Sequence, residues 1–215
     1  MGDDAFTGMR IEYGDEPLQR AGMPADPLVL LREWLAAAHA ARVSEPNGMA
    51  LATCGTDGQP HCRIVLLKEL DDRGLTFFTN KDSDKGRQLR SNARAAATFW
   101  WPAPRNRQVR VEGSIEDATE AVSDRYFGER PRRAQLCSAS SPQSRVVTGR
   151  AELEQLVEAL ARQVGDGPVP RPPHWGGYVL VPSAIEYWQG REARLHDRFR
   201  YVKQAGSWRL ERLAP

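Results

Sequence analysis

Apolar residues recur at helical spacing near the start of the chain. Between residues 28 and 38, leucine or alanine returns every three or four positions, which places these side chains on one face of a helix. Asp26 followed by Pro27 is a typical helix start, because aspartate caps free N–H groups and proline suits the first helical position. The pattern therefore predicts a helix that ends near Arg42.

From residue 49 onward the pattern changes to short apolar runs rich in β-forming residues. Turn residues such as Asp57-Gly58 and Arg73-Gly74 separate the first runs, which predicts an antiparallel meander closing into a barrel. Prolines at 168, 170, 172 and 173 then enforce an extended linker before the chain returns to β structure. The expected strands are 49–54, 62–69, 75–79, 95–101, 108–116, 177–188, 197–203 and 207–213.

Helical segments are also expected between these strands. Residues 83–92 suit a short helix capped by Ser83 or Asp82, and 119–128 and 151–164 suit two more. Residues 1–25 carry few apolar anchors, which predicts a mobile N-terminal arm, and residues 26–215 are expected to form one domain. The predicted fold class is α+β, mainly β, with the helices at the periphery.

Composition narrows the possible functions. The chain has 215 residues, 40% of them hydrophobic, and a formal net charge of +2, which does not favour a nucleic-acid-binding protein. Its three cysteines form no C-x-x-C pair and share no metal-ligand spacing with histidine, so we expect reduced thiols and no metal. We find neither a leader pattern nor a membrane span, and therefore expect a cytoplasmic protein.

Cations bracket one of the expected strands. Arg63 and Lys68 lie at the two ends of an apolar run, which suggests that each has an anionic partner, although solvated strand ends fit equally well. Thr79 closes the next strand, and Lys85 lies in the first turn of the helix after it. A hydroxyl, helix N–H groups and these cations would make a phosphate site in a chain that has no glycine-rich phosphate loop.

Three other places carry candidate ligands, each with a plain structural alternative. Gln108 would bond the edge of a heterocycle, or it is a solvated residue on an edge strand. Tyr126 and Arg130 end a helix, where the dipole favours cations in any case. Gln143-Ser144 would donate to phosphate oxygens, or it belongs to an ordinary serine-rich loop.

The segment from Trp188 to Arg198 contains three arginines and a histidine just after an apolar run. Arg194, His196 and Arg198 occupy alternate positions, so an extended backbone would place all three on one face. Such a group suits an anion or a flat polar ligand. A serine–histidine–carboxylate triad has no support at diagnostic positions.

In combination, these motifs closely resemble the pyridoxine (pyridoxamine) 5'-phosphate oxidase family. The resemblance runs from about Arg10 to the end of the chain and includes Trp175-Gly176-Gly177. It implies a homodimeric split β-barrel that binds FMN at the subunit interface. It also implies transfer of a hydride from the 4'-carbon of a phosphorylated pyridine to the flavin, with oxygen as acceptor and hydrogen peroxide as product.

The resemblance assigns roles to individual positions of this chain. Arg194 and His196 would lie against the pyridine ring as the catalytic pair, and Arg10 to Tyr13 would form an arm over the substrate. The substrate set is Arg10, Tyr13, Lys68, Tyr126, Arg130, Arg194 and His196. The FMN set is Arg63, Ile64, Val65, Leu66, Lys68, Phe78, Thr79, Lys85, Gln108, Gln143, Ser144, Trp188 and Arg198.

The chain departs from the family pattern near both expected phosphates. Ala134 replaces a serine that helps to bind the substrate phosphate, and Asp84 replaces an arginine beside the FMN phosphate. Residues 136–141 lack the usual Gly-Ala-Trp. Related flavin oxidases of phenazine biosynthesis, which act on dihydro-aromatic acids, resemble the chain in this loop and are the alternative. A non-catalytic flavin or pyridoxal phosphate carrier, or a basic nucleic-acid module, represents a different class of function.

Overall fold

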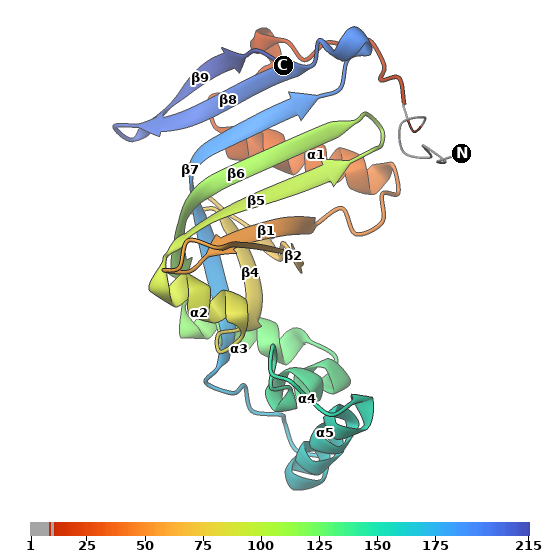
Figure 1. Cartoon of the computed structure of the whole chain (residues 1–215), viewed down its shortest axis with the longest axis vertical. Helices are drawn as coiled ribbons and strands as arrows, with labels where there is room; N and C mark the ends of the chain where they lie inside the picture. The colour runs from red at the N-terminus through yellow and green to blue at the C-terminus, as the bar shows by residue number, and fades with distance from the viewer. Residues whose placement is uncertain (1–8, 10) are drawn as a thin grey trace, which may run out of the picture. The chain divides into compact units, whose positions relative to one another are not determined.

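The computed structural model describes residue 9 and residues 11–215, and it forms a mainly β fold with short helices (Figure 1). Nine strands of this described part pair in one sheet, in the order β2-β1-β5-β6-β7-β4-β3, with β8 on β7 and β9 on β8. The predicted fold class is thereby confirmed. The strands are β1 Gly48–Cys54, β2 Pro60–Leu66, β3 Glu69–Leu70, β4 Leu75–Asn80, β5 Arg94–Trp101, β6 Arg107–Asp117, β7 Trp175–Gln189, β8 Asp197–Gln204 and β9 Ser207–Leu213.

Helix starts follow the capping signals of the sequence. The Asp26 carboxylate accepts from the Leu28 N–H at 2.9 Å, and the Ser83 hydroxyl accepts from the Gly86 N–H. The α-helices are α1 Pro27–Ala40, α2 Asp84–Ser91, α3 Glu120–Glu129, α4 Arg132–Ser140 and α5 Arg150–Val164, with 3-10 turns at Arg20–Gly22 and Glu192–Arg194. None of the described helices is long and apolar enough to cross a membrane.

Three local expectations are wrong. Helix α4 was expected to be loop, the run 62–69 divides into β2 and β3, and the strand order is no simple meander because β4 pairs with β7. The register places Phe78 opposite Gly177 and Asn80 opposite Trp175. Turn residues report only on neighbours along the chain, so a pairing between strands about a hundred residues apart leaves no local signal.

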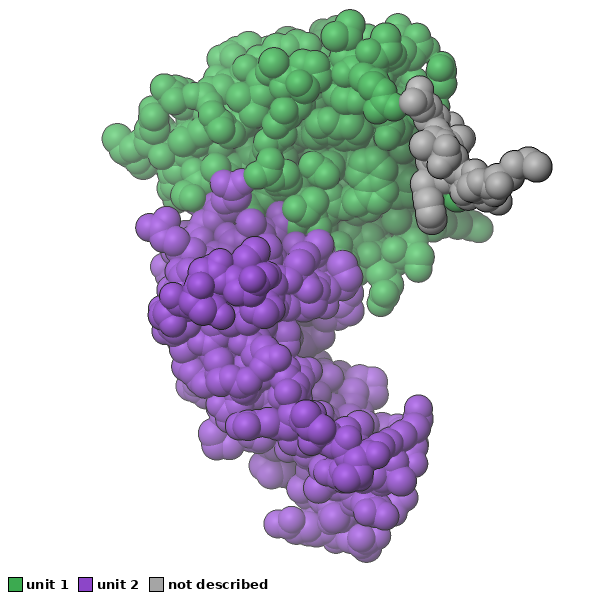
Figure 2. Space-filling model, in the orientation of Figure 1, with its two compact units in different colours: residues 1–48, 98–111, 183–215 green, residues 49–97, 112–182 purple. Residues whose placement is uncertain are grey.

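The chain divides into two compact units, coloured separately in Figure 2. Unit 1 comprises residues 1–48, 98–111 and 183–215, and unit 2 comprises residues 49–97 and 112–182. In unit 1 the Trp34 ring of α1 packs edge-on against Tyr187 of β7, with centroids 5.1 Å apart. The buried Tyr187 hydroxyl donates to the Pro27 carbonyl at 2.6 Å, which joins the start of α1 to the sheet.

Unit 2 has a cluster of buried apolar residues among its helices. Phe127 of α3, Leu136 of α4 and Trp175 of β7 pack together with Val169 of the proline-rich linker. Helix α4 lies beside α5, as Figure 1 shows. Burial of these side chains accounts for most of the stability of α4, whose own composition favours a helix only weakly.

Candidate active site

Unit 2 contains a cavity of about 450 Å³ that many of the predicted site residues line. Its wall includes three cations, Lys68, Lys85 and Arg130, and no carboxylate among the described residues. A pocket with this charge favours anionic ligands. The predicted residues that the structure brings together in its wall are Ile64, Val65, Leu66, Lys68, Phe78, Thr79, Lys85, Tyr126, Arg130 and Gln143.

One group of donors in this pocket surrounds Lys85. The Lys85 ammonium donates to Gln143 Oε1 at 2.8 Å, to Thr79 Oγ1 at 3.0 Å and to Ser83 Oγ at 3.1 Å. Burial, and then the nearby Arg63 guanidinium, lowers the pKa of Lys85 to about 8. The hydrogen bonds of this half-buried lysine go to neutral oxygens, so an anion bound beside it would further favour the charged form.

Arg63 lies next to this group and is held by neutral acceptors. Its guanidinium donates to Thr53 Oγ1, to the Leu51 carbonyl at 3.1 Å and to Gln88 Oε1 at 3.2 Å. Burial lowers the pKa of Arg63. Within the described part of the chain no carboxylate is hydrogen-bonded to Arg63, so this cation could bind an anionic ligand.

Asp84, which stands where the family usually has an arginine, is paired with a cation of the same helix α2. The Asp84 carboxylate pairs with Arg87 one turn later, so part of its negative charge is neutralised. The Asp84 backbone N–H donates to Ser144 Oγ at 3.2 Å, which brings Ser144 to the start of α2. Ser144 has a left-handed backbone, with φ of 70°.

A second group in the pocket is built on stacked aromatic rings. Phe78 stacks on Tyr126 with centroids 4.2 Å apart and on Trp175 at 5.5 Å. The close approach of Phe78 requires Gly177 opposite it, because a Cβ there would lie 2.9 Å from the Phe78 ring. The Trp175-Gly176-Gly177 motif therefore serves the packing of this site.

Two cations lie against this aromatic group. The Lys68 ammonium is 5.8 Å from the Tyr126 ring centre, and the Arg130 guanidinium is 5.0 Å from that of Trp175. Arg130 also donates to Ser138 Oγ at 2.6 Å. Burial lowers the pKa of Arg130, which marks a guanidinium that is partly withdrawn from water.

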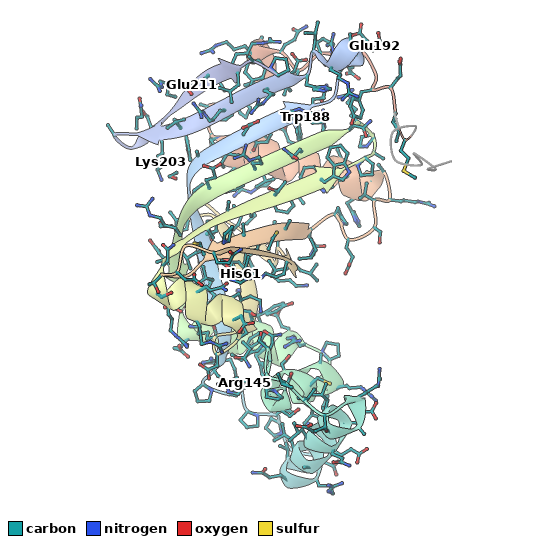
Figure 3. The ribbon with its side chains drawn as sticks, in the orientation of Figure 1. His61, Arg145, Trp188, Glu192, Lys203 and Glu211 are labelled. Atoms are coloured by element: carbon teal, nitrogen blue, oxygen red, sulfur yellow. The ribbon has the colours of Figure 1, made fainter. Side chains whose placement is uncertain are left out.

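Unit 1 holds the remaining predicted residues, with Trp188 of β7 labelled in Figure 3. The Tyr13 ring lies edge-on to Trp188 at 5.8 Å and to His196 at 5.6 Å, and the last two rings are 4.7 Å apart. His196 Nδ1 accepts from the Arg191 N–H at 3.1 Å. Burial, followed by the charge of Arg194, lowers the pKa of His196.

The expectation of an extended backbone before Asp197 is wrong. Residues Glu192–Arg194 form a 3-10 turn, with φ of 50° at Ala193 and 61° at Arg194, so Arg194 and His196 are not successive residues of one strand face. Arg194 is exposed and lines a cavity of about 300 Å³ together with Tyr13. Strand β8 starts only at Asp197, after this turn.

Arg198 and Gln108 lie on strands of unit 1. Arg198 donates to Glu186 Oε1 at 2.8 Å and to the Ala214 carbonyl at 2.9 Å, and this hydrogen bond to Glu186 raises its pKa. Gln108 is half-buried on β6. Arg10, the remaining predicted substrate residue, lies outside the described residues.

The described part of the N-terminal arm is bonded to β7 and β8. The Gln189 amide donates to the Glu16 carbonyl at 2.6 Å, and the Leu18 N–H donates to the buried Asp197 carboxylate at 3.0 Å. Arg191 pairs with Asp15 at 2.6 Å. These bonds hold Tyr13 beside His196.

The structure adds lining residues that the sequence did not assign. Ser138 and Cys137 come from the unpredicted helix α4, and Trp175 was noted only as part of a motif. Asn80 and Ser141 also line the cavity. Trp175 had a usable signal, since two glycines that follow an aromatic residue indicate close packing.

The sheet and its helices define a protein of the split β-barrel class. The family model described as pyridoxamine 5'-phosphate oxidase matches residues 35–163, and that described as pyridoxine 5'-phosphate oxidase C-terminal dimerisation region matches residues 175–215. The chain therefore belongs to the pyridoxamine 5'-phosphate oxidase family.

Individual relatives match nearly the whole chain. A pyridoxine/pyridoxamine 5'-phosphate oxidase of Pseudomonas paraeruginosa is 54% identical over 98% of this chain and 99% of its own length. The one from Burkholderia lata is 48% identical over the same shares. PhzG of Burkholderia lata, solved with tetrahydrophenazine-1-carboxylic acid, has a TM-score of 0.86 and 32% identity, covering 94% of this chain and 100% of that one.

Proposed function

We propose that the chain is an FMN-dependent oxidase that converts pyridoxine or pyridoxamine 5'-phosphate to pyridoxal 5'-phosphate, with oxygen as acceptor. The products would include hydrogen peroxide and, from the amine, ammonia. The observation that carries the proposal is the presence of two separate cationic groups in one pocket, around Lys85 and around Arg130. One phosphate belongs to the cofactor and one to the substrate, so the reaction requires two anion sites.

The donor set around Lys85 fits the FMN phosphate. Lys85, Arg63, Thr79, Gln143 and Ser144 offer two cations, two hydroxyls and an amide, and the hydrogen bonds of Lys85 go to neutral oxygens that a phosphate could replace. FMN held there would supply a hydride acceptor for the substrate that oxygen could reoxidise. In this assignment the protein positions both molecules and excludes water.

The group around Arg130 fits the substrate phosphate. Lys68 and Arg130 supply two cations. Tyr126 supplies a phenol hydroxyl, and the Lys68 ammonium lies over its ring. The phosphate is remote from the reacting carbon. Its binding energy would therefore hold the pyridine ring in the orientation that the reaction requires.

Arg194 and His196 would orient the pyridine ring. The neutral imidazole accepts at Nδ1 from the Arg191 N–H, so its proton lies on Nε2, which is then a donor for a ring substituent. Arg194 would cover the free face of the ring by stacking. We propose that the arm, from Arg10 to Tyr13, closes over the same ligand. The assignments of Ile64, Val65, Leu66, Phe78, Gln108, Trp188 and Arg198 to FMN rest on the resemblance.

We further propose a homodimer with FMN at the subunit interface. The matched dimerisation region, residues 175–215, contains Trp188 and Arg198 of the proposed FMN set. We regard residues 1–25 as the arm and 26–215 as one functional domain. A cytoplasmic enzyme is in line with the three cysteines, which form no disulfide in the described chain.

A phenazine-type oxidase is the second candidate, favoured by the likeness to PhzG and by the changes at 134 and 136–141. Against it, the chain is 48% identical to the pyridoxine/pyridoxamine 5'-phosphate oxidase of Burkholderia lata and 32% identical to PhzG from the same organism. Lys68 and Arg130 would also supply two cations, which suit a phosphate dianion better than the single charge of a carboxylate.

Aerobic turnover of the FMN-loaded protein tests the proposal. With pyridoxine 5'-phosphate we expect pyridoxal 5'-phosphate and peroxide in equal amounts. Turnover of tetrahydrophenazine-1-carboxylic acid alone would establish the second candidate. A protein that binds FMN but oxidises neither compound would be a carrier and would contradict both.

A further inference from the structure

We propose that the Ser138 hydroxyl binds the substrate phosphate and thereby takes over the role of the hydroxyl that position 134 lacks. The inference rests on the proposed function and extends it to a residue of helix α4 that the family pattern does not assign.

Position 138 is one helical turn away from position 134. Both lie in α4, Arg132–Ser140, and residues four apart share one face of a helix. Ser138 is half-buried and lines the same cavity as Lys68, Tyr126 and Arg130. A hydroxyl at 138 is therefore on the same side of α4 as one at 134 and borders the proposed substrate site.

The hydrogen bond of Ser138 leaves its proton available. The Arg130 Nη1–H donates to Ser138 Oγ at 2.6 Å, so the serine oxygen is the acceptor. A hydroxyl has one O–H to donate in addition to its acceptor capacity. Ser138 can thus accept from Arg130 and donate to a phosphate oxygen at the same time.

The surroundings favour an anion at this hydroxyl. Arg130 is held against the Trp175 ring at 5.0 Å, and burial lowers its pKa. No carboxylate lines the cavity among the described residues, so a bound phosphate meets no fixed negative charge there. Ser138 and Arg130 would then act as neighbouring donors to one phosphate group.

Steady-state kinetics of S138A in the FMN-loaded enzyme test the inference. We expect the KM for pyridoxine 5'-phosphate to rise about tenfold, which corresponds to about 1.4 kcal/mol, with kcat and FMN content retained. S140A is the matched control, because the Ser140 hydroxyl donates to the Leu136 carbonyl at 2.9 Å and does not line the cavity. An S138A enzyme with the same KM as S140A would overturn the proposal.

Restoring the hydroxyl one turn earlier separates phosphate binding from helix stability. We expect A134S/S138A to recover most of the affinity for pyridoxine 5'-phosphate that S138A loses. A134S should change this affinity less in the wild-type background than in the S138A background. Failure of this rescue would count against an equivalent role for the two positions.

Binding of inorganic phosphate to FMN-loaded protein, measured by calorimetry, distinguishes failure of the inference from failure of the proposed function. If wild type does not oxidise pyridoxine 5'-phosphate, the proposed function fails, yet a weaker affinity of S138A for phosphate than of S140A would still support the role of Ser138. Equal affinities would overturn that role whatever the substrate.

Discussion

Tyr13 lies directly against Gly190, the residue after strand β7. A Cβ built on Gly190 would be 2.7 Å from the Tyr13 ring. The position of Tyr13 therefore requires a residue without a side chain at position 190. The Gly190 N–H also donates to the Asn106 carbonyl at 2.8 Å, which fixes the backbone there. The arm therefore has to move when Gly190 gains a side chain.

We expect G190A to displace Tyr13 from Trp188 and His196 and to raise the KM for substrate several-fold, since the proposed cover over the ring is lost. Limited proteolysis, with sites located by mass spectrometry, should show faster cleavage within residues 11–18. G14A is the control, because no atom of the residues that the structure describes lies within 4 Å of a Cβ at Gly14. Equal cleavage of the two variants would contradict the dependence on Gly190.

FMN binding should take up a proton at pH 9. In the apoprotein the pKa of Lys85 is lowered to about 8, so the amine is mostly neutral at this pH. A phosphate dianion next to it raises the pKa again, and the complex holds the proton that the free protein lacks. The affinity for FMN should therefore fall as the pH rises above about 8.

Titration calorimetry in buffers of different ionisation enthalpy measures this proton directly. K85R is the matched variant, because an arginine stays charged throughout this range and its complex should take up no proton. Uptake that persists in K85R would assign the proton to another group.

His196 should be neutral at pH 7. Burial and Arg194 both lower its pKa below the ordinary 6.5, and Nδ1 can accept from Arg191 only in the unprotonated state. An NMR titration of the histidine ring protons should therefore show one resonance with a pKa below 6.5 that is absent from H196N. A His196 resonance that titrates at 6.5 or above would contradict this environment.

R194A should lower kcat/KM for pyridoxine 5'-phosphate by about 10- to 100-fold, because the ring loses the group that fixes its orientation. The FMN content, read from flavin absorbance, should not change. R209A removes an exposed arginine of β9 in the same unit and serves as the control. Matching kinetics for the two variants would remove Arg194 from the proposed site.

Local signals predicted most helix starts and most strands, and family motifs predicted most of the residues that line the main cavity. Helix α4 could not be predicted in this way, because its serines compete for the backbone and its apolar residues show no helical period. It is stabilised instead by Leu136 in the core and by the Gln135 amide, whose Nε2 lies 3.0 Å from the carbonyl oxygens of Phe127, Gly128 and Arg130 and shares its two N–H groups among them. The contact of Ser138 with Arg130 depends on this tertiary packing.

The 3-10 turn at Arg194 was missed because the sequence there has a misleading strand signal. Alternation of charged residues is typical of a strand, but the positive φ values of Ala193 and Arg194 interrupt it. Outside glycine and asparagine, such backbone angles have no reliable sequence signal. The separation of the candidate residues into two units likewise follows from strand pairing and is not visible along the chain.

Among the described residues, the wall of the main cavity carries Lys68, Lys85 and Arg130 and no carboxylate, which affects the choice of buffer. Any small dianion would lower the repulsion among these cations, so we expect inorganic phosphate and sulfate to bind in the cavity. In phosphate buffer they compete with cofactor and substrate while raising the melting temperature through linkage. Affinities should therefore be measured in an amine or zwitterionic buffer, where the pocket is open to the ligand being studied.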